Sequence, residues 1–106
     1  MKEERFRYND RLGIPIPSLK LMWEEYKSEE QEEILSQWEM IRGGIPDRIK
    51  ELEAVINRKQ ALLQDEHDFQ ISCLLNQDIA DVASIINDLH LWYRTHQSIE
   101  VTKAHA

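Results

Sequence analysis

The side chains of this chain that could carry chemistry are carboxylates and histidines on helical segments. Glutamates are concentrated between residues 24 and 39, and Asp88 and His90 lie far along the chain. If these segments share a helical bundle, the glutamates could converge with Asp88 or His90 to hold a metal ion or to form an acid–base pair. No H-x-x-x-H or E-x-x-H pattern supports such a site. We therefore predict no catalytic residue, no metal ligand and no cofactor, with a helical-bundle enzyme or metal-binding protein as the alternative.

A second set of carboxylates recurs along one predicted helix. Asp81 and Asp88 are two turns apart on one face, and Asp78 is adjacent to Asp81. The simplest interpretation is a solvated acidic edge, and the functional interpretation is a surface that receives a basic partner. The single cysteine, Cys73, has no Lys, Arg or His beside it in the sequence to lower its pKa, so we interpret it as a packed thiol.

Charge and composition limit the class of protein. A net charge of −7 disfavours direct binding of nucleic acid, because phosphate contacts need clustered Lys and Arg. It leaves open that the chain imitates nucleic-acid charge and occupies a basic binding protein. No apolar run approaches the roughly 20 residues of a membrane span, and the N-terminus lacks the apolar part of a signal peptide. One cysteine allows no intrachain disulfide, so we expect a single cytoplasmic domain over residues 1–106, without membrane contact.

The elements that would position these side chains are two long helices. Residues 68–94 carry apolar side chains at alternating spacings of three and four, and residues 46–64 repeat the same phase. The polar turn between them predicts an antiparallel helical hairpin. The facing rows are Ile45, Ile49, Leu52, Ile56, Lys59 and Leu63 in the first arm, and Leu75, Ile79, Val82, Ile86, Leu89 and Tyr93 in the second. The apolar residues left for another surface are Val55, Leu62, Leu74, Ile85 and Trp92.

Two shorter helices are predicted before the hairpin, over residues 19–27 and 28–42. Ser28 and Gln31 fit a capping box, and Gly43-Gly44 offers the left-handed residue that commonly ends a helix. Whether the two helices are continuous is left open. We expect an all-α fold of three or four helices with its core in residues 18–94. The second face of the hairpin is then covered by these helices, by a second chain, or by both.

Both ends of the chain lack a helical period. Phe6 and Tyr8 alternate as in a strand, but no partner strand is evident, so residues 1–17 are predicted to be a flexible, extended arm. Its Ile14-Pro15-Ile16-Pro17 segment is stiff and apolar, and it either packs on the core or docks a partner. Residues 95–106 are predicted to be a flexible tail.

The second arm opens with Asp68-Phe69-Gln70, and Leu75 and Ile79 follow at helical spacing. With these residues, the segment 52–82 resembles the UVR motif, a helical hairpin of the excision-nuclease B and C subunits and of some bacterial protease regulators. Asp68-Phe69-Gln70 nearly matches the Asp-Phe-Glu of that motif, whereas its Leu-Arg-Asp is replaced by Leu75-Asn76-Gln77, which has no arginine. The resemblance implies protein–protein interaction, often through paired hairpins, and no catalytic activity.

Taken together, these patterns favour a noncatalytic interaction or regulatory module, either an adaptor or an antagonist of a protein partner. A homodimer is the expected assembly, because a chain this short is marginal as a monomer. A domain of this size seldom buries three tryptophans, so at least one is a candidate interface anchor, with Trp92 and Tyr93 first. The candidate partner-binding residues are Trp23, Trp38, Leu74, Asp81, Ile85, Asp88, Trp92 and Tyr93.

Overall fold

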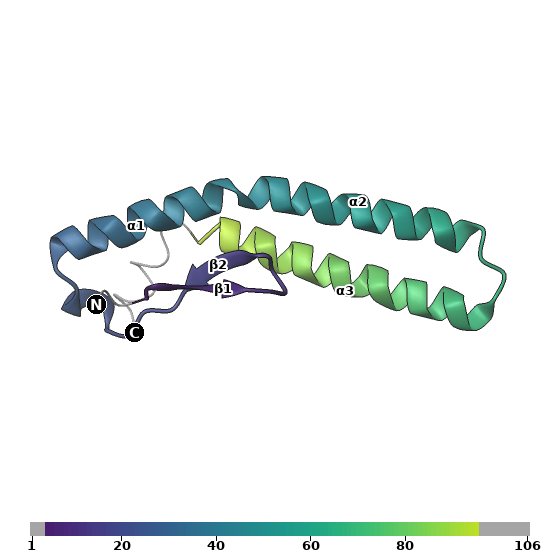
Figure 1. Ribbon diagram of the computed structural model, residues 1–106, viewed down its shortest axis with the longest axis horizontal. Helices are drawn as coiled ribbons and strands as arrows, with labels where there is room; N and C mark the ends of the chain where they lie inside the picture. Colours follow the sequence, from purple (N-terminus) through teal and green to yellow (C-terminus); the bar gives the residue numbers. More distant parts are fainter. Residues whose placement is uncertain (1–3, 96–106) are drawn as a thin grey trace.

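The computed structural model describes residues 4–95, and most of them are helical. The elements in chain order are β1 (Phe6–Asn9), β2 (Ile14–Pro17), a 3-10 helix η1 (Trp23–Glu25), α1 (Ser28–Gly43), α2 (Ile45–Gln64) and α3 (Phe69–Tyr93). Helices α1 and α2 run end to end as one bent helix, and α3 returns beneath α2 (Figure 1). The molecule measures 60 × 27 × 23 Å, and its radius of gyration is 18.1 Å. A compact chain of this length would have a radius of about 13 Å, so this fold is elongated.

The predicted helical hairpin is confirmed. Helix α3 begins after Asp68, whose carboxylate accepts hydrogen bonds from the backbone N–H groups of Gln70 (2.9 Å) and Ile71 (3.2 Å). This cap satisfies donors that the first helical turn leaves unpaired. Lys59, the one charged position in the facing row, lies 3.1 Å from Asp78 across the hairpin. The break in the apolar row is therefore occupied by an ion pair between the two arms.

The predicted flexible arm is wrong, because residues 6–17 form a two-stranded antiparallel sheet. Phe6 lies opposite Pro17, and Asn9 lies opposite Ile14. The prediction had no partner strand for Phe6 and Tyr8, and the extended segment Ile14–Pro17 supplies it. Both strands of a two-stranded sheet are edges, where proline is tolerated. The fold is therefore mostly helical with a small sheet, and not all-α as predicted.

A tight turn joins the two strands. Gly13 has a φ of 78°, in the region that favours glycine. Its N–H donates to the Asn9 carbonyl oxygen (2.7 Å), and the Leu12 N–H donates to the Asn9 side-chain oxygen (2.9 Å). Leu12 and Ile14 on either side of this glycine are buried. Of the two interpretations of the Ile-Pro-Ile-Pro segment, packing on the core is the observed one.

The short helices before the hairpin differ from prediction. The predicted helix over residues 19–27 is reduced to η1, and the chain is extended at Lys27 before α1 begins. The predicted capping box of Ser28 and Gln31 is also wrong. The Glu30 carboxylate accepts from the Lys27 N–H (3.1 Å), and the Gln31 side chain donates to the Trp23 carbonyl oxygen (2.9 Å).

Helix α1 does not fold back onto the hairpin. Gly44 has φ −88° and ψ −9°, which is right-handed helical geometry and not the predicted left-handed stop. The chain therefore bends at Gly44 and continues into α2, so α1 extends away from the hairpin and packs on β2. The predicted three- or four-helix bundle within one chain does not form.

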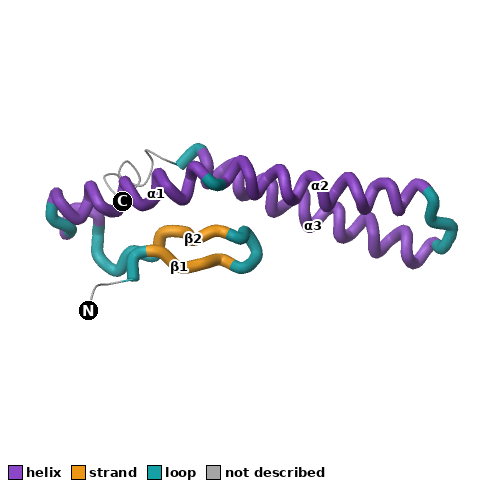
Figure 2. Tube along the Cα trace, turned by 45° about the horizontal axis from the view of Figure 1, so that its top comes forward, coloured by secondary structure: helices purple, strands orange, loops and turns teal. Residues whose placement is uncertain are grey.

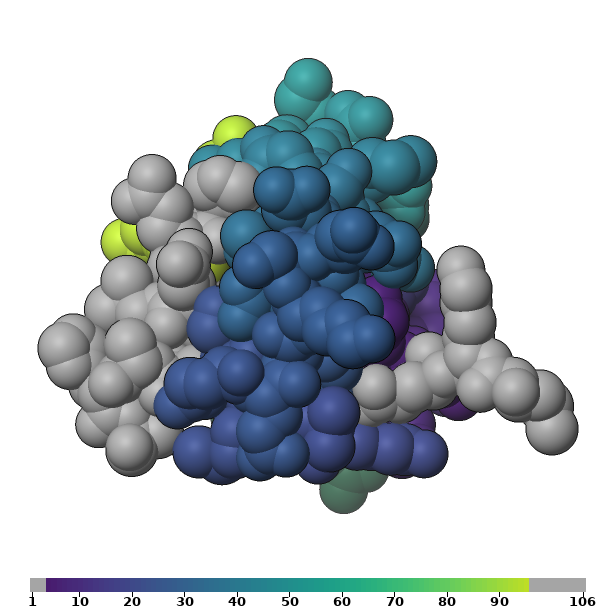
Figure 3. Space-filling model, turned by 90° about the vertical axis from the view of Figure 1, so that its left-hand side faces the viewer, coloured from purple at the N-terminus to yellow at the C-terminus, as the bar shows by residue number. Residues whose placement is uncertain are grey.

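The core lies at one end of the molecule. Trp38 is completely buried, its ring stacked on Phe6 (6.4 Å between centroids) and met edge-on by Trp92 (5.7 Å). Seen from that end, the residues of α1 and of the segment before it occupy the middle of the surface (Figure 3). Among the described residues, the buried side chains are Phe6, Leu12, Ile14, Trp23, Tyr26, Ile34, Trp38, Ile45, Ile49, Leu52 and Leu89.

This distribution divides the molecule into two regions. We call residues 4–52 and 86–95 the proximal body, and residues 53–85 the distal hairpin. Every buried side chain of the described chain belongs to the proximal body, and the distal hairpin has none. The tail predicted over residues 95–106 lies, apart from Thr95, outside the described residues.

Candidate protein-docking surface

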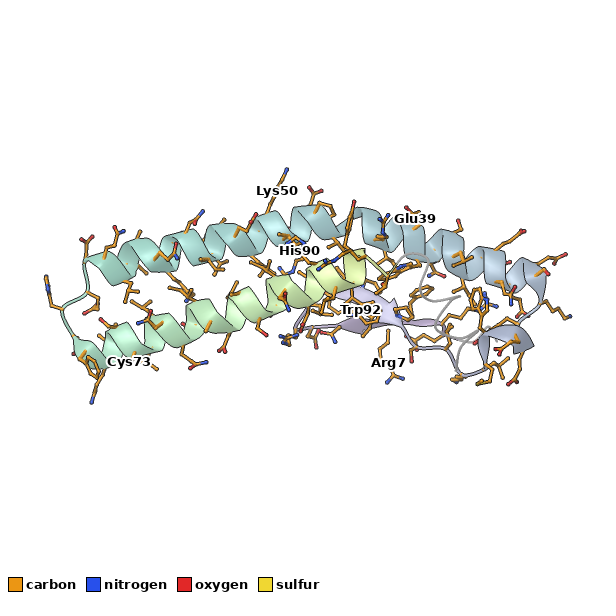
Figure 4. All side chains as sticks on the ribbon, turned by 180° about the vertical axis from the view of Figure 1, so that it is seen from behind. Arg7, Glu39, Lys50, Cys73, His90 and Trp92 are labelled. Atoms are coloured by element: carbon orange, nitrogen blue, oxygen red, sulfur yellow. The ribbon has the colours of Figure 1, made fainter. Side chains whose placement is uncertain are left out.

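The aromatic residues predicted as interface anchors are used mainly within the proximal body. Trp23 and Trp38 are buried, so neither offers a surface to a partner. Trp92 is half-buried where the C-terminal end of α3 meets the strands (Figure 4). The Arg42 guanidinium lies 4.3 Å from the centroid of the half-buried Tyr93 ring, and its Nε donates to the Tyr93 carbonyl oxygen (2.6 Å). These contacts join α1 to the end of α3.

The acidic edge predicted along α3 is engaged in polar contacts. Asp88 pairs with Arg11 at 2.7 Å, which ties the turn of the β-hairpin to α3. Asp78 pairs with Lys59, and Asp81 accepts a hydrogen bond from the Gln77 side chain (2.9 Å). Two of these three carboxylates therefore join elements of the fold.

The structure does not bring the glutamates of residues 24–39 to His90 or Asp88. His90 is exposed on α3, beside Lys50, whereas Glu39 pairs with Arg42 on α1 (Figure 4). Within residues 4–95, no three His, Cys, Asp or Glu side chains gather closely enough to hold a metal ion. The acidic run of α1 is itself partly neutralised by the N-terminal segment, through the salt bridges of Arg5 to Glu30 (3.0 Å) and Glu33 (3.1 Å).

Cys73 is exposed at the far end of the molecule, so the predicted packed thiol is wrong (Figure 4). The prediction rested on the lack of basic neighbours in the sequence, which does not determine whether another element covers this part of α3. In the described chain, α2 alone accompanies it there, and a helix with one neighbour buries only the side facing that neighbour.

One side of the hairpin continues unbroken from the proximal body into the distal hairpin. At 100° per residue, Val55, Lys59 and Leu62 follow Arg48 along one flank of α2. On α3, Ile71, Leu74, Asp78 and Ile85 share the flank that also carries Asp88. The Lys59–Asp78 ion pair joins the two flanks into a single surface. We call this surface the distal face: Val55, Lys59, Leu62, Ile71, Leu74, Asp78 and Ile85.

The turn of the β-hairpin covers only the proximal end of this side. Arg48 donates to the Leu12 carbonyl oxygen (2.9 Å), and Arg11 reaches Asp88 and Ser84. Beyond that turn, α2 and α3 continue together without a third layer in the described chain (Figure 2). Leu74 is consequently 65% exposed, Leu62 60% and Ile71 45%. The distal face is thus an apolar surface spread over two helices.

A further apolar side chain, Phe69, is 81% exposed at the start of α3. Its helical position is more than a quarter turn from Leu74, so it lies outside the distal face. The role of Asp68 as a helix cap explains the first residue of the Asp68-Phe69-Gln70 sequence without any family relationship, whereas the exposure of Phe69 has no such local explanation.

Of the candidate partner-binding residues named from the sequence, Leu74 and Ile85 lie on the distal face. Leu62 and Ile71 were not named as candidates, although Leu62 was among the residues left for another surface. The signal that would have found both is the continuation of the apolar flank past the residues that the β-hairpin covers.

Comparisons with known proteins give no relative. No protein-family model, curated protein or solved structure matches this chain. The resemblance of residues 52–82 to the UVR hairpin stays a prediction. None of the helices within residues 4–95 combines the length and apolar character that crossing a bilayer requires.

Proposed function

We propose that this chain is a noncatalytic protein–protein interaction or regulatory module. Its proximal body positions the distal hairpin, to which a protein partner binds. The observation that carries the proposal is the exposure of Leu62, Ile71 and Leu74 on one side of two adjacent helices. Single exposed apolar side chains are ordinary on soluble proteins, but a continuous set on an otherwise uncovered side favours a binding surface.

The energetics of the distal hairpin support a binding role. Two helices that meet along one seam gain little stability from packing, because each buries only one stripe. A partner that covered Leu62, Ile71 and Leu74 would remove three large apolar side chains from water, each worth roughly 1.5–3 kcal/mol when fully buried. The free energy gained by this burial would serve either role. An adaptor would use it to recruit a partner, and an antagonist would use it to occupy the partner's binding surface.

The use of the acidic side chains also supports binding over catalysis. General acid–base chemistry needs carboxylates in contrasting environments within a pocket that excludes water. Asp78 and Asp88 instead lie at the surface in ion pairs with Lys59 and Arg11.

Site-specific photo-crosslinking tests the proposal. A photoreactive phenylalanine derivative is placed at Leu74, and the matched control carries it at Met40, which is 79% exposed on α1. In extract of the source cells, we expect a discrete protein adduct from position 74 and little or none from position 40. Equal yields from the two positions would contradict the proposal, because Met40 is at least as accessible to chance encounters as Leu74.

A further inference from the structure

We infer that the first occupant of the distal face is a second copy of this chain, packed face to face and antiparallel. Its twofold axis lies along the line of the Lys59–Asp78 ion pair, so that α3 packs on α3 and α2 on α2. This inference rests on the proposed function, since it names the partner of the same surface.

The spacing of apolar residues about the ion pair is symmetric on α3 and nearly symmetric on α2. On α3, Leu74 and Val82 lie four residues before and after Asp78, and Ile71 and Ile85 lie seven residues before and after it. On α2, Val55 and Leu62 lie four residues before and three after Lys59. A surface contacts its own copy across a twofold axis only if it is self-complementary. In the antiparallel pair, Ile71 faces Ile85 of the second copy. Leu74 lies against the edge of the seam of the second copy, at the position of the half-buried Val82.

Charge favours the antiparallel orientation over the parallel one. The hairpin turn carries Asp65, Glu66 and Asp68, and a parallel pair would place two such turns side by side. The antiparallel pair separates them to opposite ends of the interface. At the axis, two lysines and two aspartates meet with a net charge of zero, and a polar group in an otherwise apolar seam fixes its register at some cost in stability.

The available area sets the expected strength. From Ile71 to Ile85, α3 rises about 21 Å, and two helices side by side are about 20 Å wide. Their plan area of about 400 Å² per copy is about half of the 800 Å² per partner that stable interfaces typically bury, so the contact belongs to the weak, transient class. We therefore expect a dimer that dissociates on dilution, and not an obligate one.

The opposite side of the hairpin is a poorer candidate for this contact. It carries a shallow groove lined by Glu53, Ile56, Asn57, Ala83 and Ile86. Two of these side chains are polar, one is an alanine, and the two isoleucines belong to the seam between α2 and α3. Apart from Phe69, the exposed large apolar side chains of the distal hairpin are on the distal face.

Oligomeric state tests the inference first. Sedimentation of the full chain is measured from about 5 to 500 μM, which brackets a dissociation constant of about 50 μM. We expect a rise with concentration from the 12.6 kDa monomer to twice that mass. Leu74→Glu and Leu62→Glu should remain monomeric and keep the helical circular dichroism of the wild type, because both side chains are exposed in one copy. Met40→Glu adds the same charge on α1 and should dimerise like the wild type.

Cysteine pairing tests the register. In a Cys73→Ser background, Ile71→Cys and Ile85→Cys chains are oxidised separately and as a mixture. A disulfide needs Cα atoms within about 7 Å, and equivalent residues in the antiparallel dimer are about 21 Å apart along α3. We expect an interchain disulfide only in the mixture. Disulfides within either separate sample would indicate parallel pairing and overturn the inference.

Other results separate this inference from the proposed function. A monomer at every concentration, a dimer that survives Leu74→Glu, or a dimer that Met40→Glu abolishes would overturn the inference. If the chain is monomeric but the photoreactive group at position 74 captures another protein, the proposed function stands and only the second copy is excluded. If neither occurs, both fail.

Discussion

The proximal body and the distal hairpin are built from the same two helices and differ in what lies beside them. In the proximal body, α2 and α3 meet the turn of the β-hairpin and the end of α1, and side chains such as Ile45 and Leu89 are completely buried. In the distal hairpin, the same apolar rows continue, but no third layer of the described chain covers them. The proposed binding surface therefore lies in the distal hairpin, where the apolar rows continue beyond the residues that the β-hairpin covers.

The comparison also shows why the molecule needs its proximal body. A two-helix hairpin buries too little surface to order itself firmly, and its helices depend on tertiary packing for most of their stability. The bent α1–α2 helix passes from one region into the other, so the packing around Trp38 holds the start of α2 in place. The packing around Trp38 therefore also sets the position of the distal hairpin.

The largest expected effect comes from the centre of the proximal body. Trp38→Ala removes a completely buried ring that contacts Phe6 and Trp92, and it should lower the free energy of unfolding by about 3–5 kcal/mol. Urea denaturation followed by circular dichroism measures the change. Leu74→Ala in the distal hairpin serves as the control and should cost under about 0.5 kcal/mol at concentrations where the chain is monomeric. A loss of unfolding free energy below about 1 kcal/mol for Trp38→Ala would contradict the central role of Trp38 in stabilising the proximal body.

Two leucines of one row provide a closer comparison. Leu89 is completely buried in the proximal body, and Leu75 is half-buried fourteen residues earlier on the same row of α3. Leu89→Ala should cost about 2–5 kcal/mol, and Leu75→Ala no more than half as much, because its neighbours are already partly hydrated. Equal costs in the same urea experiment would mean that the two regions are packed alike.

A pair of glycines tests the join between the β-hairpin and α2. An alanine at Gly13 would adopt an unfavourable φ of 78°, and its Cβ would collide with the Arg48 guanidinium. We expect Gly13→Ala to cost about 1–2 kcal/mol, because a left-handed conformation is strained for any residue with a Cβ. At Gly43 a Cβ meets nothing within 4 Å, so Gly43→Ala should stabilise α1 by up to about 1 kcal/mol. Thermal denaturation that shifted both variants in the same direction would contradict the described geometry.

The sequence was sufficient to predict the hairpin because its two apolar rows share a phase and a polar turn separates them. It was insufficient for the elements that cover the hairpin. Gly43-Gly44 is typical of the end of a helix, but the backbone at Gly44 stays right-handed. Helix α1 therefore extends away from the hairpin and does not fold back onto it. The extended segment Ile14–Pro17 was interpreted as packing on the core or docking a partner, so its pairing with Phe6–Asn9 was not predicted. Its prolines are tolerated because both strands are sheet edges.

The candidate surface was predictable only in part, because burial depends on tertiary neighbours. Trp23 and Trp38 are of a residue type that is common at interfaces, but both are buried in the core. Leu62 and Leu74, both predicted from the sequence to be left for another surface, are exposed, whereas Ile85 packs partly against the core. Their role in binding a partner stays a prediction. No pattern in the sequence marks where along α2 and α3 the β-hairpin stops, since the rows are equally apolar on both sides of that point.

Hydrogen exchange measured by mass spectrometry, at low and high protein concentration, tests the central claim most directly. The claim predicts that amides of residues 53–85 exchange quickly in the dilute protein and become protected as concentration rises, while α1 and the β-hairpin stay protected throughout. In Leu74→Glu, the distal amides should exchange quickly at both concentrations. Distal amides as well protected as those of the proximal body in the dilute protein would show that the hairpin is stable uncovered, and would contradict the account.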